Sequence, residues 1–436
     1  MQTLEELNSG ALKGTKSLKL SCELKEVPRE IFQLADTLEV LDLSGNLISG
    51  LPDNFDCLQN LKILFLSENQ FVKFPSILAK CSKLDIIGFK ANKISYIDED
   101  SFPPELRWLI LTNNDLPSLP DSIGKCYRLQ KLMLAGNRLT TLPSDLSNCK
   151  NLELVRISAN QISELPNWLL SLPKLSWLAF AGNPYSSHSI NNEIEEINWS
   201  NLSIKEKLGE GASGTIYLCL LNEPRVKQVA LKLFKGEITS DGFPDDEMKA
   251  SIAAGNHNNL VRILGKISNH PTGMQGLVLE LIPGNYKNLG NPPNFETCTR
   301  DTYPSDLSFS FYDAMRILIS ISSAVNHLHS RNIIHGDLYA HNILYEKENF
   351  QILFGDFGAA TIYTKEKKIS LMQLEVRAFG CLIEDLFVRI NRDSIKDKAL
   401  QNLESLKVEC MQEDVFNRPL FGEISERLDK ILKEYF

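Results

Sequence analysis

The first half of the 436-residue chain is built from a repeated pattern of apolar residues. From Leu38 onward the pattern LxxLxLxxNxL occurs seven times, with a period of 23 residues and one step of 22, and a degenerate copy surrounds Leu18 and Leu20. A single copy is too short to bury its own apolar face. Successive copies must therefore stack on one another, which restricts this part of the chain to a curved solenoid with a parallel sheet along its inner side.

One asparagine stands at the same place in every clear copy of the pattern. These residues are Asn46, Asn69, Asn92, Asn114, Asn137, Asn160 and Asn183. A buried carboxamide can satisfy backbone groups of the adjacent turn, so we expect an asparagine ladder. The pattern is the signature of leucine-rich repeats and predicts an α/β leucine-rich-repeat solenoid, with about eight repeats, over residues 1–186. Three cysteines that keep a fixed place in the repeat, Cys81, Cys126 and Cys149, are expected to be packing residues.

Alternate residues of each short strand are expected to face the open, concave side of the solenoid. These positions carry a stripe of apolar side chains: Val40, Ile63, Phe65, Ile86, Trp108, Ile110, Met133, Leu154 and Trp177. A large exposed apolar patch usually marks a binding surface, so the stripe predicts a docking face for a protein substrate or regulator. The alternative is that long flanking side chains cover the stripe.

Composition limits the partners and the compartment. A net charge of −9 argues against nucleic acid or an anionic membrane as the main partner. The chain has no run of 18 apolar residues and no signal-peptide core near its start, which predicts a cytoplasmic protein without a membrane span. Translocation by a secretion system stays open. Nine dispersed cysteines are typical of reduced thiols, and the polar residues 187–200 indicate a cap or linker.

Polar groups suited to phosphoryl transfer lie close together after this linker. His335-Gly336-Asp337-Leu338 is followed by Asn342, and then by Asp356-Phe357-Gly358. An aspartate can accept the proton of an attacking hydroxyl, while an asparagine and a second aspartate are suitable ligands for Mg²⁺. Apolar runs of strand length flank this segment. We therefore expect Asn342 and Asp356 to meet at adjacent strand ends.

This segment resembles the catalytic loop and the Mg²⁺-binding loop of the protein kinase superfamily. The resemblance implies an α+β bilobal protein-kinase-like domain over residues 201–436. It also implies that Asp337, Lys232, Asn342 and Asp356 are catalytic, with Asn342 and Asp356 holding Mg²⁺ or, alternatively, Mn²⁺. The supporting match is Val229-Ala230-Leu231-Lys232, a strand whose lysine would grip the α- and β-phosphates of ATP.

The same resemblance implies a set of residues that hold ATP. The set is Leu208, Gly209, Gly211, Gly214, Ile216, Ala230, Lys232, Glu247, Glu280, Ile282 and Leu344. Its glycines would lie over the phosphates. Glu247 is the preferred carboxylate partner for Lys232, but Asp245 and Asp246 compete, and either could instead be a charge favoured at a helix N-terminus.

Three residues of the catalytic loop depart from the family pattern. Gly336 replaces an arginine that usually binds a phosphorylated activation loop, so activation by loop phosphorylation is not expected. Tyr339 and His341 stand where a lysine or arginine usually neutralises the γ-phosphate. In the long insertion at 283–306, the pair Arg300-Asp301 either touches substrate or is merely solvated.

A further departure is length. Only 16 residues separate Gly358 from Glu375, which opens a match to the central helix of the large lobe. The peptide-docking platform is therefore short, and the usual glutamate partner of a late arginine, here Arg418, is missing.

The favoured function is an ATP-dependent protein kinase that transfers the γ-phosphate to a protein hydroxyl, with Ser or Thr favoured over Tyr. The repeats would recruit the substrate or a regulator. Two alternatives remain: an ATP-binding pseudokinase that acts as a scaffold or switch, and a small-molecule kinase. The sequence leaves open the substrate, the acceptor residue and the regulatory input.

Overall fold

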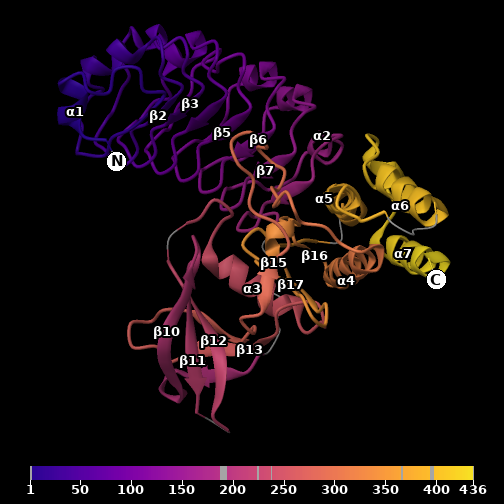
Figure 1. Ribbon diagram of the computed structural model, residues 1–436. Coiled ribbons are helices and arrows are strands. Elements are labelled where there is room, and N and C mark those ends of the chain that lie inside the picture. The colour runs from indigo at the N-terminus through magenta and orange to yellow at the C-terminus, as the bar shows by residue number, and fades with distance from the viewer. Residues whose placement is uncertain are drawn as a thin grey trace. The chain divides into compact units, whose positions relative to one another are not determined.

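The computed structural model describes residues 2–186, 194–222, 225–236, 238–364, 367–392 and 397–435. The chain divides into two compact units, Met1–Leu172 and Pro173–Phe436 (Figure 1). The last repeat thus falls in the second unit. Part of the predicted linker, residues 187–193, lies outside the described residues, and the domain boundaries drawn from the sequence stay a prediction.

The first unit is a solenoid of short parallel strands (Figure 1). The strands are β1 (Ser17–Lys19), β2 (Val40–Asp42), β3 (Ile63–Phe65), β4 (Ile86–Gly88), β5 (Trp108–Ile110), β6 (Lys131–Met133) and β7 (Leu154–Arg156). Each strand pairs with the next in register, as in Leu41↔Leu64. The central leucine, isoleucine or valine of each strand is buried, because the next repeat covers it.

Short helices form the return segments of the repeats. They are α1 (Leu4–Asn8), η1 (Arg29–Leu34), η2 (Phe55–Cys57), η3 (Ser76–Lys80), η4 (Asp121–Lys125), η5 (Ser144–Asn148) and α2 (Asn167–Leu170), of which the η elements are 3₁₀ helices. Proline precedes several of them, as Pro120 does at φ −69° before η4. Its fixed φ starts the turn where no ladder bond is needed. Cys126 and Cys149 are buried there, and burial raises the pKa of each thiol to about 12, as expected of packing residues.

The predicted asparagine ladder is confirmed. Asn69 Nδ2 donates to the carbonyl oxygens of Leu43 (2.9 Å) and Leu66 (3.2 Å), and its Oδ1 accepts from the N–H of Ile48 (2.9 Å). The same arrangement recurs at Asn92 and Asn137. Each carboxamide therefore joins two neighbouring repeats through buried backbone groups, and carbonyl oxygens such as those of Leu43 and Leu66 are shared with the asparagine of an adjacent repeat.

The prediction of a continuous exposed apolar stripe is wrong for four of its nine residues. Ile63, Ile86, Leu154 and Trp177 are buried. Side chains in register lie next to one another along the ladder, and the Phe65 ring lies so close to Gly88 that a Cβ there would be 2.7 Å from it. Lys131 also covers Trp108, with Nζ 4.1 Å from the ring. The remaining members, Val40, Phe65, Trp108, Ile110 and Met133, are half-buried.

The second unit begins with β8 (Trp177–Ala179), the strand of the last repeat, and continues into a six-stranded sheet. The strands of this sheet lie in the order β10 (Leu202–Glu210), β11 (Gly214–Leu221), β12 (Lys227–Phe234), β14 (Gly276–Glu280), β13 (Ile263–Ser268) and β9 (Glu196–Asn198), with η6 (Trp199–Asn201) after β9. All neighbours are antiparallel except β13 and β9. Helix α3 (Pro244–Ala254) lies between β12 and β13 in the chain. The hydrophobic core of the sheet includes Val229, Leu231 and Val278.

The remainder of the second unit is mainly helical, with two small sheets. It contains α4 (Phe311–Ser330), α5 (Lys368–Phe387), α6 (Asp397–Cys410), η8 (Val415–Asn417) and α7 (Phe421–Tyr435). Small strands lie beside α4: β15 (Tyr286–Asn288), β17 (Ile343–Glu346) and β18 (Ile352–Phe354) form one sheet, β16 (Ile333–Ile334) and β19 (Thr361–Ile362) another, and η7 (Ala340–Asn342) precedes β17. Figure 1 shows the large sheet and helices α4–α7 at opposite ends of the unit, which gives the predicted bilobal fold.

Candidate active site

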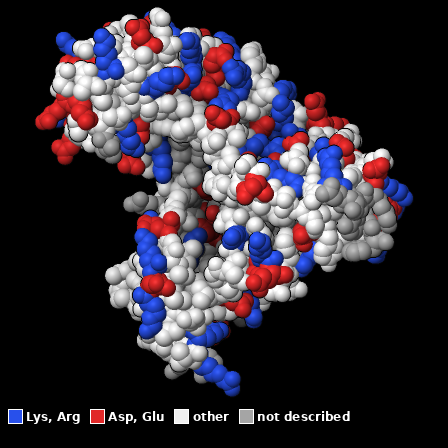
Figure 2. Space-filling model, in the orientation of Figure 1, with Lys and Arg blue, Asp and Glu red and all other residues white. Residues whose placement is uncertain are grey.

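A cavity of about 510 Å³ lies between the sheet and the helical part of the second unit. Ten of the eleven predicted ATP-binding residues line it, and only Gly209 does not. Asn342 and Asp356 also line it, whereas Asp337 is connected to it through Asn342. On the visible face of each unit, basic and acidic side chains are interspersed rather than gathered in one patch (Figure 2).

The glycine-rich turn between β10 and β11 forms one wall of the cavity. Gly211 N–H donates to the carbonyl oxygen of Gly214 at 2.9 Å and closes the turn. At Gly214 a Cβ would stand 2.5 Å from the carbonyl oxygen of Leu233 on the neighbouring strand, so a larger residue would push the strands apart. Glycine here keeps the turn close to β12, the strand that carries Lys232.

Lys232 and Glu247 form an ion pair inside the cavity. Glu247 lies in the first turn of α3 and is 4% exposed. Burial raises the pKa of its carboxyl, although the charge of Lys232 and its hydrogen bond oppose the shift. The two competitors point elsewhere, since Asp245 and Asp246 both face Lys249.

The catalytic loop brings Asp337 and Asn342 together. Asn342 Nδ2 donates to the Asp337 carboxylate at 2.8 Å and to its carbonyl oxygen at 3.0 Å. Gly355 N–H donates to the Asn342 carbonyl oxygen at 3.1 Å, because β17 begins directly after Asn342 and β18 ends directly before Gly355, with Ile343 opposite Phe354. This places Asn342 and Asp356 at neighbouring strand ends, as the sequence predicts.

The oxygens of Asn342 and Asp356 fit a divalent cation. Asp337 engages the amide nitrogen of Asn342, which leaves its carboxamide oxygen for a ligand. Asp356 has a left-handed backbone, with φ +58°, a conformation that aspartate tolerates better than most residues. One of its carboxylate oxygens accepts from Gly358 N–H at 3.1 Å. Carboxylate and carboxamide oxygens are the donors that Mg²⁺ prefers.

A buried carboxylate on α5 holds the start of the loop. Glu375 accepts a hydrogen bond from Gly336 N–H at 2.8 Å and one from His329 Nε2 at 2.7 Å. Burial alone raises the pKa of Glu375, but the hydrogen bond and charge of His329, the charge of His335 and the Gly336 N–H outweigh it, so the pKa lies below its usual value. Sequence reasoning identified the helix but not this role.

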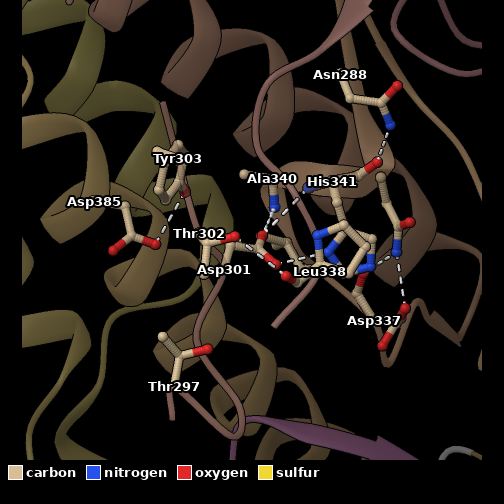
Figure 3. Close-up of polar contacts among 12 residues, drawn as sticks. Asn288, Thr297, Asp301, Thr302, Tyr303, Asp337, Leu338, Ala340, His341 and Asp385 are labelled. Atoms are coloured by element: carbon tan, nitrogen blue, oxygen red, sulfur yellow. Dashed lines mark hydrogen bonds and ion pairs between the residues drawn. The ribbon is translucent and has the colours of Figure 1, made fainter. Parts of the chain in front are cut away.

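Asp301 of the long insertion holds the other end of the loop. One oxygen accepts from the backbone N–H groups of Ala340 (2.6 Å) and His341 (3.2 Å), and the other accepts from His341 Nδ1 at 2.7 Å (Figure 3). Burial lowers the pKa of His341, but the hydrogen bond and charge of Asp301, together with other nearby carboxylates, raise it overall. His341 also lines the cavity.

The expectation that Arg300-Asp301 touches substrate or is solvated is therefore wrong. Arg300 pairs with Glu384 (2.7 Å) and Asp385 (2.6 Å) on α5. Tyr303 donates to Asp385 at 3.1 Å (Figure 3). The pair anchors the insertion to α5 and to the catalytic loop. No periodicity or motif in the irregular insertion singled out Asp301.

Comparison with known proteins agrees with this architecture. Residues 202–378 match the family model of the protein kinase domain, and residues 13–71, 104–162 and 127–184 match that of the leucine-rich repeat. The chain thus contains leucine-rich repeats followed by a protein kinase domain. A domain of this family uses ATP and a divalent metal ion.

Several curated proteins are similar to part of this chain. Fibroblast growth factor receptor 1 of Xenopus laevis is 25% identical over 58% of this chain and 38% of its own length. Wall-associated receptor kinase-like 6 of Arabidopsis thaliana is 28% identical over 43% of this chain and 28% of its own length. The probable serine/threonine-protein kinase pats1 of Dictyostelium discoideum is 32% identical over 55% of this chain and 9% of its own length. The chain therefore spans well under half the length of each of these relatives.

A solved leucine-rich-repeat protein of Leptospira interrogans is 30% identical over 41% of this chain and 46% of its own length, with a TM-score of 0.39. Among the helices that the structure describes, none has the length and apolar character needed to cross a membrane.

Proposed function

We propose that the chain is an ATP-dependent protein kinase that transfers the γ-phosphate to a protein hydroxyl. One observation carries the proposal: Lys232, Glu247, Asn342 and Asp356 line one cavity, and Asp337 is hydrogen-bonded to Asn342 beside it. A lysine paired with a glutamate is positioned to bind phosphates, and the same cavity presents the oxygens of Asn342 and Asp356 next to the proton acceptor Asp337.

Each group has a specific task in this proposal. Lys232 binds the α- and β-phosphates, and the glycine-rich turn lies over them. Asn342 and Asp356 hold Mg²⁺, which when bound neutralises charge on the phosphates. Asp337, oriented by Asn342, accepts the proton of the acceptor hydroxyl. Serine or threonine is favoured as acceptor, in line with the name of the pats1 relative, a probable serine/threonine-protein kinase.

The repeats supply substrate or regulator recruitment in this proposal, through the half-buried residues of the concave strands. The nine cysteines, odd in number and dispersed, favour a reducing cytoplasmic compartment.

Phosphate transfer from labelled ATP tests the proposal directly. The purified chain is compared with Asp337→Asn, Asp356→Asn and the control Asp429→Asn, which changes an exposed aspartate of α7. We expect incorporation into a generic protein acceptor to vanish in the first two variants and to persist in the control. Phosphosite mapping then identifies the acceptor residue. Tight ATP binding by calorimetry without any transfer by the wild type would overturn the proposal and favour a nucleotide-dependent switch.

A further inference from the structure

The last repeat packs directly on the catalytic loop within the second unit. Trp177, the first residue of β8, is 2% exposed. Its indole N–H donates to the carbonyl oxygen of Leu338 at 3.0 Å, and its ring is stacked on Tyr339 with 4.4 Å between centroids and 8° between planes. One tryptophan thus contacts both residues that follow Asp337.

Gly336, which precedes Asp337, is held against the same strand. Its φ is +71°, and a Cβ at this position would stand 2.6 Å from the carbonyl oxygen of Leu178 and 2.8 Å from that of Ala359. Any side chain would therefore collide with the backbone of the last repeat. The unusual glycine of the loop is explained by this close approach.

Three further contacts join the last repeat to the helical part of the unit. Arg418, whose partner the sequence left open, donates to the Pro173 carbonyl oxygen at 2.7 Å. Arg377 of α5 donates to the carbonyl oxygen of Lys174 at 3.2 Å. Phe180 N–H donates to Thr361 in the short segment after Gly358 at 3.3 Å. The repeat therefore contacts α5, the short segment after Gly358, and Arg418 just before α7.

We propose that the last repeat replaces a longer activation segment as the support of the catalytic loop, and that Trp177 is a positioning residue for Asp337. The inference rests on the proposed function for its kinetic part only. Its physical content is that the loop keeps its catalytic arrangement through Trp177 and the Leu178 backbone, without a phosphorylated side chain to hold it. A displacement of Asp337 by about 1 Å is enough to slow proton transfer from an acceptor hydroxyl, so the support of the loop affects the rate.

Trp177→Phe tests the positioning role with little risk to the fold, since phenylalanine keeps an aromatic ring over Tyr339 but cannot donate to Leu338. The matched control is Trp199→Phe, at a half-buried tryptophan that packs on the core of the large sheet in the same unit. Two readouts are needed: hydrogen exchange of the amides of residues 336–342, and kcat with KM for ATP in transfer to a generic acceptor.

We expect Trp177→Phe to exchange the loop amides faster and to lower kcat about five- to tenfold, the scale of one lost hydrogen bond, while KM for ATP is unchanged. Trp199→Phe should change neither. Unchanged loop exchange and kcat in Trp177→Phe, with only a lower melting temperature, would make Trp177 an ordinary core residue and overturn the inference. If the wild-type protein transfers no phosphate but the loop amides still exchange faster in Trp177→Phe, the proposed function is overturned and the positioning role is supported.

Discussion

Glu247 shows how one buried residue can decide whether the cavity is ready for a nucleotide. Its carboxylate is taken out of water, which is unfavourable unless a cation accompanies it, and Lys232 is that cation. The neighbouring carboxylates, Asp245 and Asp246, are half-buried, pair with Lys249 and do not share the task. The position on α3, rather than the charge, distinguishes the three acidic residues.

Glu247→Gln is expected to release Lys232 from its fixed position, because an amide cannot balance the ammonium charge. We predict that kcat/KM for ATP falls by about a hundredfold, equivalent to about 3 kcal/mol of transition-state stabilisation. Steady-state kinetics at varied ATP measure this. The matched control is Asp245→Asn, at an acidic residue in the same first turn of α3. Its kcat/KM for ATP should stay near the wild-type value. Equal losses in the two variants would contradict the assignment.

Glu375 stabilises the catalytic loop through an ionised carboxylate, and its pKa lies below the ordinary value of 4.5. A group whose pKa is lower in the folded than in the unfolded chain contributes stability above the unfolded value. That contribution is lost as the pH falls through the folded value.

Glu375→Gln is therefore expected to reduce the free energy of unfolding at neutral pH by about 2 to 4 kcal/mol, because His329 and the Gly336 N–H lose a charged acceptor. The variant should also lose less stability than the wild type on acidification below pH 4.5. Urea unfolding at a series of pH values tests both points. The exposed Glu426→Gln serves as control, and parallel pH curves for wild type and Glu375→Gln would refute the linkage.

At the scale of elements, the parts that the sequence predicts are those whose contacts repeat or lie close in the chain. The asparagine ladder follows from a fixed period, and the meeting of Asn342 with Asp356 follows from two short strands that must pair. The exposed stripe fails at Trp177 because Leu338 and Tyr339, which are distant in the chain, cover it, and elsewhere for local reasons that alternation cannot reveal. Side chains such as Phe65 lean over a neighbouring glycine, and long polar residues such as Lys131 cover aromatic rings.

The asparagine ladder makes a prediction about the first unit. Asn137→Ala would leave the N–H of Leu116 without its buried partner and would remove one of the two asparagine donors from the carbonyl oxygens of Leu111 and Leu134. We expect a loss of about 2 to 4 kcal/mol in the free energy of unfolding, measured with urea. Asn54→Ala, at an exposed residue whose side chain forms no cap hydrogen bond, should change it by less than about 0.5 kcal/mol. Equal losses of unfolding free energy in Asn137→Ala and Asn54→Ala would show that the ladder does not stabilise the solenoid.

At the scale of the whole molecule, the features that the sequence could not predict are contacts between distant segments. Arg418 meets Pro173 across 245 positions, Trp177 meets Leu338 across 161, and Asp301 meets Ala340 across 39. None of these residues belongs to a motif that specifies its partner. Each partner is a backbone group, which leaves no mark in the sequence, so only the folded chain reveals that a repeat and an insertion support the catalytic loop.

The remaining half-buried concave residues give the last prediction, which concerns how the repeats serve the kinase. Phe65 and Trp108 keep part of their apolar surface accessible, and aromatic residues of this kind often dominate binding. If the repeats recruit a protein substrate, Phe65→Ala and Trp108→Ala should each lower kcat/KM about tenfold for a cellular substrate found by phosphosite mapping. Activity on a generic acceptor should not change, because the substitutions lie outside the unit that holds the cavity. Tyr127→Ala, at an exposed aromatic residue outside the strands, controls for general surface effects. Equal kcat/KM for the cellular substrate in all variants would show that substrate choice resides in the kinase domain alone.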